Sequence, residues 1–173
     1  AGRHIAQNAL AVLGAAYLAG ADLDRVVPQL ASLQAERGRG QVHRLAHPQG
    51  TITLIDESYN ANPASMRAAI ELLAATPVAQ GGRRVAVLGD MLELGAHSAK
   101  LHAGLAEPLK AAGIDLALLG GTEMQALADK LPESFKSEYR SDSAELRQLA
   151  LDEISAGDVV MVVLLEAQMA DFL

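Results

Sequence analysis

The stretch Thr51-Ile52-Thr53-Leu54-Ile55-Asp56-Glu57-Ser58-Tyr59-Asn60-Ala61-Asn62-Pro63 decides the fold class, because it joins a predicted strand to a predicted helix. Its first five residues are β-branched or apolar and follow a turn at 48–50, as expected of a strand. Residues 63–75 carry apolar side chains at helical spacing, and Asn62 before Pro63 is a typical N-cap and first-turn pair. Polar side chains therefore gather at the carboxyl end of a strand, where open α/β sheets bind ligands. A capped turn without a ligand would explain the same residues.

From residue 41 onward the sequence alternates between strand and helix patterns. We expect strands at 41–46, 51–56, 84–89, 114–119, 137–140 and 158–164, and helices near 63–75, 98–112, 122–131 and 143–155. This alternation predicts an α/β fold, Rossmann-like, with a mostly parallel sheet and flanking helices. The first two strands are expected to form an antiparallel hairpin at the edge of the sheet.

Two helices without a strand between them are expected to precede this domain, at 4–19 and from Asp22 to about Leu33. The polar run 34–40 that follows contains two arginines and two glycines, which favours a linker. We therefore expect a domain boundary that divides the chain into 1–36 and 37–173.

The composition excludes several classes of function. The chain has 173 residues, a formal charge of −7, no cysteine, no tryptophan, two phenylalanines and three tyrosines. Disulfides, thiolate metal sites and a cysteine nucleophile are thereby excluded, and an aromatic nucleic-acid surface is disfavoured. No apolar run reaches the roughly 18 residues that span a bilayer, so we expect a soluble protein without membrane insertion. The start on Ala1 and on helical sequence suggests a piece of a longer chain.

The sequence offers few motifs for phosphate or metal binding, and plainer explanations exist for them. No P-loop motif occurs, and the loop 89–95 (Gly-Asp-Met-Leu-Glu-Leu-Gly) is not a dinucleotide fingerprint, although its acids after a strand suit a ligand loop. A plain loop in which Asp90 or Glu93 is a cap would explain the same residues. The five histidines lack zinc-binding spacing, so no metal site is expected. His102 follows the loop on a predicted helix and could reach the same crevice. The pair Arg37 and Arg39 could bind phosphates, but a solvated linker is the simpler explanation.

Four stretches, taken in order, resemble the Mur ligase family. They are Gly2-Arg3-His4 with Asn8-Ala9-Leu10, Gly38-Arg39, Ser58-Tyr59-Asn60-Ala61-Asn62-Pro63 with Ser65-Met66, and the loop 89–95 with His102. The resemblance implies three domains, of which this chain would hold the last helices of the central ATP-binding domain and the C-terminal domain. It also implies an ATP-dependent, amide-forming ligase of peptidoglycan precursor synthesis in the cytoplasm, acting through an acyl phosphate. The partners would be UDP-N-acetylmuramoyl-tripeptide and D-alanyl-D-alanine, and the ligase would be monomeric.

The resemblance also implies roles for single residues. ATP and Mg²⁺ would be bound mainly by the central domain, so this chain alone would be inactive and would hold no metal. The residues near the nucleotide would be Asn8, Arg39, Asp56, Glu57 and Asn60. Those near the substrate would be Tyr59, Asn62, Glu93 and His102.

The chain departs from the family pattern at three places. Ile5 stands where the family has Asn, Glu57 where it has Asp, and Val163-Leu164-Leu165 where it has Lys-Gly-Ser. These departures keep open a non-catalytic α/β binding module derived from the family. A folylpolyglutamate synthase-like ligase domain shares the fold and chemistry but fits the segment from Tyr59 to Pro63 less well.

Overall fold

A computed structural model describes residues 3–30 and 38–164, and the chain divides into two compact units, 1–36 and 37–173. The first unit contains α1 (Arg3–Leu18) and α2 (Leu23–Leu30). The expected cap of the second helix is present, since the Oδ1 atom of Asp22 accepts a hydrogen bond from the Asp24 N–H at 3.0 Å. The expected end of that helix, near residue 33, lies outside the described residues. That this unit comes from a central ATP-binding domain stays a prediction.

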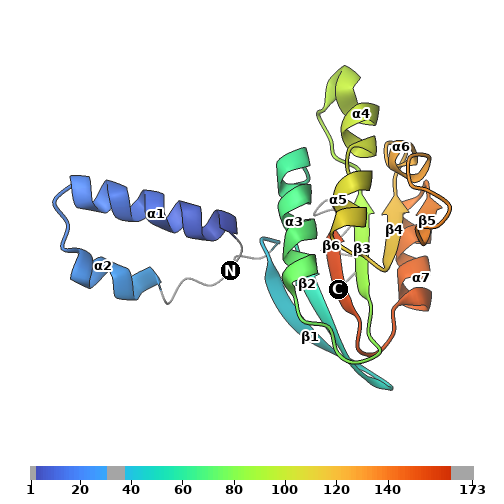
Figure 1. Ribbon diagram of the computed structural model, residues 1–173, viewed down its shortest axis with the longest axis horizontal. Helices are drawn as coiled ribbons and strands as arrows, with labels where there is room; N and C mark the ends of the chain where they lie inside the picture. The colour runs from blue at the N-terminus through green and yellow to red at the C-terminus, as the bar shows by residue number, and fades with distance from the viewer. Residues whose placement is uncertain (1–2, 31–37, 165–173) are drawn as a thin grey trace. The chain divides into compact units, whose positions relative to one another are not determined.

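The second unit is built on one six-stranded sheet, shown in Figure 1. Its spatial order is β1-β2-β6-β3-β4-β5, and β1 is antiparallel to β2 whereas all other neighbours are parallel. The mostly parallel sheet and the antiparallel edge hairpin are thus confirmed. The strands are β1 (Gln41–His47), β2 (Gly50–Asp56), β3 (Arg84–Gly89), β4 (Leu116–Gly120), β5 (Ser137–Arg140) and β6 (Val159–Val163).

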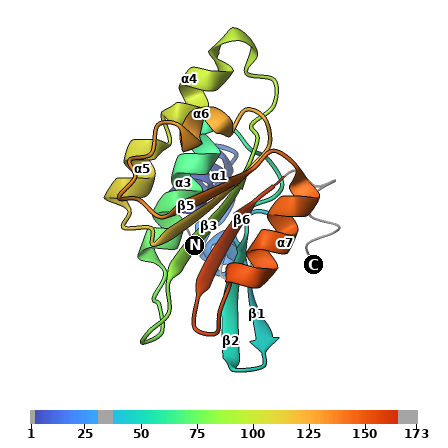
Figure 2. The same ribbon diagram turned by 90° about the vertical axis from the view of Figure 1, so that its right-hand side faces the viewer.

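Helices cover both faces of the sheet. Helices α3 (Pro63–Ala75), α4 (Ser98–Ala103), α5 (Ala106–Ala111) and α6 (Gln125–Ala128) lie on one side, and α7 (Ser143–Glu153) lies on the other (Figure 2). A short 3₁₀ turn, η1 (Gly95–His97), precedes α4. The change of side between β5 and β6 returns the chain to the middle of the sheet, so β6 lies between β2 and β3.

The helix predicted over 98–112 is two helices in the structure. The chain turns at Gly104 and Leu105, between α4 and α5. Pro108 explains the break, because a proline has no N–H to donate to the carbonyl four residues earlier and its ring clashes with that carbonyl. In the first turn of α5 the same proline is tolerated.

The core follows the period-two alternation of the central strands. Val85 and Val87 of β3 pack on the α7 side, whereas Ala86 and Leu88 pack on the α3 side. The strands β4 and β6 are buried along their whole length, and β3 is buried from its second residue onward. Burial on both faces explains their unbroken apolar sequences, which are typical of parallel sheets with helices on each side.

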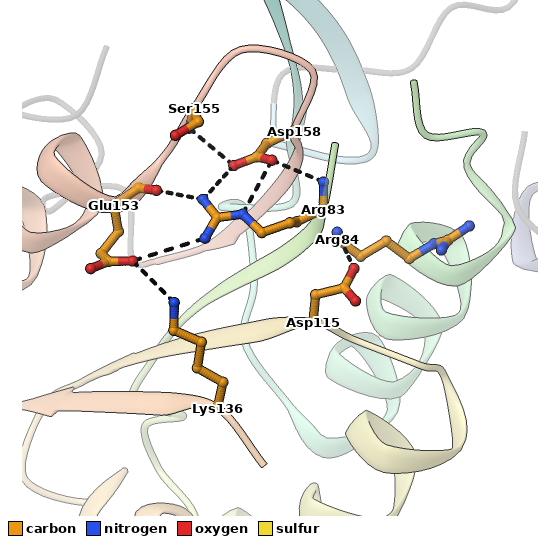
Figure 3. A network of polar contacts seen from close by, with 7 residues as sticks. All are labelled: Arg83, Arg84, Asp115, Lys136, Glu153, Ser155 and Asp158. Carbon is orange, nitrogen blue, oxygen red and sulfur yellow. Dashed lines mark hydrogen bonds and ion pairs between the residues drawn. The ribbon is translucent and has the colours of Figure 1, made fainter. Parts of the chain in front are cut away.

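A charged network closes the amino edge of the sheet (Figure 3). The carboxylate of Asp158, which is only 2% exposed, receives hydrogen bonds from the backbone and side chain of Arg83 and from the Ser155 N–H. Glu153 contacts both Arg83 and Lys136. The network therefore ties the start of β3 to the turn before β6.

Within the described parts of the chain, no helix combines the length and apolar character needed to cross a bilayer.

Candidate functional site at the carboxyl edge

The loops that leave β2 and β3 emerge on either side of the carboxyl end of β6. Helix α6 precedes β5 on one face of the sheet, and α7 follows β5 on the opposite face (Figure 2). Through α7 the chain returns from β5 at the edge to β6 between β2 and β3, so the strand order reverses at β6. Such switch points are where open α/β sheets place their ligands. The segment after β2 and the loop 89–95 after β3 are therefore the natural candidates for a site.

The segment after β2 is fixed by Asp56. Its carboxylate is 1% exposed and accepts hydrogen bonds from the N–H of Gly38 at 3.1 Å, from the N–H of Ser58 at 3.1 Å and from the hydroxyl of Ser58 at 2.5 Å. Both carboxylate oxygens are thus engaged within the chain. Asp56 was expected near the nucleotide, and its position supports the role of holding the segment that carries the neighbouring site residues.

Asn62 caps α3 as predicted. Its Oδ1 atom accepts from the N–H groups of Ala64 and Ser65, each at 3.0 Å, and the Ser65 hydroxyl accepts from the Asn62 N–H at 2.9 Å. This reciprocal pair is a capping box. Asn62 was expected near the substrate, and the structure uses the carbonyl oxygen of its side chain in the cap.

The segment 38–40 packs on the segment after β2 and is not a solvated linker. Gly38 is buried, and backbone hydrogen bonds join Tyr59 N–H to Gly38 O at 3.0 Å and Gly40 N–H to Asp56 O at 2.8 Å. Gly38 has a φ of +74°, and a Cβ atom there would lie 2.7 Å from the backbone nitrogen of Tyr59. The linker expectation is wrong for these three residues, because they are hydrogen-bonded to the segment after β2. The close approach at residue 38 requires glycine. Arg37 lies outside the described residues.

Arg39 and Tyr59 form a stacked pair on the surface of this segment. The guanidinium carbon of Arg39 lies 3.9 Å from the centre of the Tyr59 ring, and the tyrosine is 60% exposed. A guanidinium over an aromatic face is a favourable cation–π arrangement that restricts the arginine to one region. Asn60, next in the chain, is also exposed. The pair offers a positively charged, partly aromatic surface suited to phosphate groups.

Glu57 is the most perturbed acid of the segment. Burial, followed by the negative charge of Asp56, raises the pKa of its carboxyl from 4.5 to about 7, although the charge of Arg39 opposes the rise. Its Oε1 atom would lie 3.1 Å from a Cβ atom built on Gly40, so the side chain lies over that glycine. Near neutral pH the group can therefore both accept and donate hydrogen bonds.

The loop 89–95 presents Glu93 at its surface. Glu93 is exposed and has a φ of +61°, the only left-handed conformation of a residue other than glycine in the described chain. His102 is fully buried beneath the loop, where its Nε2 atom accepts from the Met91 N–H at 2.9 Å. His102 was expected near the substrate, and its contacts support a role in holding the loop.

The structure thus brings together most of the predicted residues. Arg39, Glu57 and Tyr59 share one surface, and Asn60 is the exposed residue after Tyr59. Asp56 and Asn62 hold the backbone of this segment, and Glu93 lies on the loop after β3. Asn8 lies in α1, in the first unit. Asp90 acts as a cap, which was one explanation of its loop, but sequence reasoning missed its partners, because its carboxylate accepts from the N–H groups of Glu123 and Met124. Its only signal was its position directly after a buried strand.

No group of three or more histidines or acids that could hold a metal occurs among residues 3–30 and 38–164. A surface hollow of about 570 Å³ lies between α3 and α5, lined by side chains such as Arg67, Glu71 and Pro108. None of the predicted site residues lines it. The carboxyl edge is suited to an anionic ligand, because the exposed guanidinium of Arg39 can neutralise its charge.

The comparisons with known proteins agree with this architecture. The model of the family described as Mur ligase, glutamate ligase domain, matches residues 38–163. The chain belongs to the Mur ligase family. The UDP-N-acetylmuramoyl-tripeptide–D-alanyl-D-alanine ligase of Escherichia coli is 45% identical over 127 residues, which are 73% of this chain and 26% of that protein. The chain thus spans about a quarter of the length of this relative.

Two solved structures extend the likeness to this branch of the Mur ligases. A crystal structure of MurF from Acinetobacter baumannii has a TM-score of 0.81 at 28% identity and covers 99% of this chain and 38% of that one. The MurF ligase of Thermotoga maritima, solved in complex with ADP, has a TM-score of 0.67 at 26% identity and covers 92% of this chain and 34% of its own. The family expected from the four motifs is therefore confirmed.

Proposed function

We propose that this chain is the C-terminal part of an ATP-dependent ligase that joins D-alanyl-D-alanine to UDP-N-acetylmuramoyl-tripeptide. The observation that carries the proposal is the surface formed by Arg39, Glu57 and Tyr59 at the carboxyl edge of the sheet, in a chain 45% identical to the E. coli ligase of that name. The chain would close over the nucleotide and receive the dipeptide. We also propose a cytoplasmic location and a monomeric state.

The proposed reaction has two steps. The tripeptide carboxylate takes the γ-phosphoryl group of ATP, which gives an acyl phosphate and ADP. The dipeptide amine, having lost a proton, then attacks the acyl carbon, so that the carbon–nitrogen bond forms and phosphate leaves with the electrons of the carbon–oxygen bond. Mg²⁺ would be bound mainly by the central domain and would offset the charge of the phosphates there. The described residues of this chain hold no acidic cluster for a metal.

The contribution of this chain would be electrostatic and positional. The Arg39 guanidinium, held on the Tyr59 ring, would neutralise phosphate oxygens with paired N–H donors. The Glu57 carboxyl, with its pKa near 7, would accept hydrogen bonds from ribose hydroxyl groups. Asn60 would be a further nucleotide contact, Asn8 of the first unit would contact the adenine, and Glu93 would contact the dipeptide.

An E. coli ligase whose own C-terminal segment is replaced by this chain tests the function. We expect ADP release that depends on both UDP-N-acetylmuramoyl-tripeptide and D-alanyl-D-alanine. Arg39→Ala should raise the KM for ATP about tenfold, the worth of one charge-assisted hydrogen bond. The matched control is Arg147→Ala, at an exposed arginine of α7. An unchanged KM in the Arg39 variant would remove Arg39 from the site.

A second candidate is a non-catalytic binding module of the same family. The observation in its favour is that Val163 and Leu164, in place of the family's lysine and glycine, are buried at 1% and 2% exposure. In this case the hybrid ligase would fold and bind ATP but release no ADP. The same assay therefore separates the two functions.

A further inference from the structure

The loop after β3 is held at two consecutive residues, each by a different element. We propose that Asp90 and His102 are positioning residues, which fix the loop 89–95 so that Glu93 at its tip meets the amine of the dipeptide. This inference rests on the proposed function. Neither residue touches the ligand in this arrangement, because both act through the loop.

The first anchor is the Asp90 carboxylate. Its Oδ1 atom accepts from the Met124 N–H at 2.9 Å, and its Oδ2 atom accepts from the Glu123 N–H at 3.3 Å. These two donors belong to the turn that leads into α6. The helix predicted over 122–131 is only Gln125–Ala128 in the structure, and the two donors lie directly before its first residue.

The chain leaves room for that carboxylate at Gly121. A Cβ atom on Gly121 would lie 2.4 Å from the Asp90 carboxylate, and the φ of Gly121 is +111°. Only glycine suits both the contact and the backbone conformation. Because Gly89 and Gly120 are partners on the adjacent strands β3 and β4, the Asp90 contact locks together the two loops that leave them.

The second anchor is the His102 ring. The backbone N–H of Met91 can only donate, so the Nε2 atom that it contacts at 2.9 Å must carry a lone pair. The proton of the neutral ring is then on Nδ1, which donates to the Ser98 carbonyl at 2.9 Å. Both nitrogens of this fully buried ring are thus assigned by their partners, and the ring joins the loop to α4.

Two anchors at adjacent residues leave the loop little freedom before its tip. Glu93 follows Met91 by two residues and carries an exposed carboxylate in a left-handed backbone conformation. The dipeptide brings an ammonium group, which a fixed carboxylate attracts and orients. A loop that is already ordered spares the ligand the entropy of ordering it. Loosening either anchor should therefore weaken dipeptide binding more than nucleotide binding.

Kinetics of the hybrid ligase test the role toward the dipeptide. Asp90→Asn keeps one acceptor and should raise the KM for D-alanyl-D-alanine about tenfold, while the KM for ATP stays unchanged. Asp90→Ala should raise it further, and His102→Gln should resemble Asp90→Asn. The control is Asp142→Asn, because Asp142 also accepts from two backbone N–H groups, at the start of α7. Equal effects at Asp90 and Asp142 would overturn the proposal.

Nuclear magnetic resonance of the 173-residue chain tests the anchors without any activity. The ring nitrogens of His102 should show a proton on Nδ1 and none on Nε2. Hydrogen exchange should accelerate at the Met124 N–H in Asp90→Asn and at the Met91 N–H in His102→Gln. A proton on Nε2, or unchanged exchange in both variants, would overturn the inference while leaving the proposed function intact. An inactive but folded hybrid would refute the proposed function, and with it the role toward the dipeptide.

Discussion

Replacing Asp158 with alanine is the sharpest test of how the sheet is held together. The residue lies at the amino edge, far along the chain from its partner Arg83 (Figure 3). Its Oδ1 atom accepts from the Arg83 backbone at 2.9 Å, and its Oδ2 atom accepts from the Arg83 Nη2 atom at 2.8 Å and from the Ser155 N–H at 3.0 Å. Alanine would leave the two backbone donors without this acceptor, and the Arg83 guanidinium would keep only its contacts with Glu153.

The expected loss of unfolding free energy follows from these contacts. Each of the two backbone N–H groups contributes about 1 kcal/mol, and the hydrogen bond from the charged guanidinium about 1.5 kcal/mol. The Arg83 side chain is 28% exposed and can be rehydrated in part, so we use the lower end of the range for the charged pair. Asp158→Ala should therefore destabilise the chain by about 3 to 4 kcal/mol.

Urea unfolding followed by far-ultraviolet circular dichroism measures this loss, because the chain has no tryptophan to serve as a fluorescent probe. Asp158→Asn keeps the Oδ1 contacts and should lose about half as much. The control is Asp142→Ala, which removes an exposed helix cap and should cost about 1 kcal/mol. An Asp158→Ala variant no less stable than this control would refute the reasoning.

The contribution of Asp158 also depends on pH. Burial alone would raise its pKa, but hydrogen bonds from the Arg83 side chain, Ser155 and the Arg83 backbone outweigh burial and hold the pKa below its usual value of 3.8. A carboxyl whose pKa is lower in the folded state stabilises the protein above the unfolded pKa. The stability gap between the wild type and Asp158→Asn should thus be complete at pH 7 and shrink as the pH falls below about 4.

Three further predictions concern the carboxyl edge. Gly38→Ala places a Cβ atom 2.7 Å from the Tyr59 nitrogen at a φ of +74°, so urea unfolding should show a loss of about 2 kcal/mol or more. The pKa of Glu57 rises from 4.5 to about 7 on folding, so the folded state binds the proton more tightly than the unfolded state. The stability of the wild type should therefore fall as the pH rises through this window. Glu57→Gln should lack that fall when urea unfolding is compared at pH 5 and pH 8. Glu93→Gly relieves a left-handed φ of +61° and should raise stability by about 1 kcal/mol in thermal unfolding; a loss of stability would show that the side chain outweighs the strain.

Much of the fold could be predicted because its signals are local or periodic. The Asn62-Pro63 pair placed the start of α3 correctly, since a cap acts within one helical turn. The alternation of β-branched and helical segments predicted the six strands within about two residues at each end. The break at Gly104 was missed although its cause, Pro108, was visible in the sequence.

The candidate site was predictable as a set of residues and much less as a set of roles. The segment after Ile55 was expected to carry ligand contacts, and the structure places Arg39, Glu57 and Tyr59 on one surface there. The sequence could not distinguish Asp56, which is buried, from Glu57, which is not. Adjacent residues of an extended chain face opposite sides, and only the packed neighbours decide which side is solvent.

By itself the sequence determined the family, the order of strands and helices along the chain, and the hairpin at the sheet edge. Only the tertiary structure decided that β6 lies at the centre, that His102 holds a loop from within, and that Asp90 joins two strand ends. The physical reason is the range of the interactions. Caps and periodicity act over about four residues, whereas these hydrogen bonds join Met91 to His102, Asp90 to Met124, and Arg83 to Asp158, which are 11, 34 and 75 residues apart.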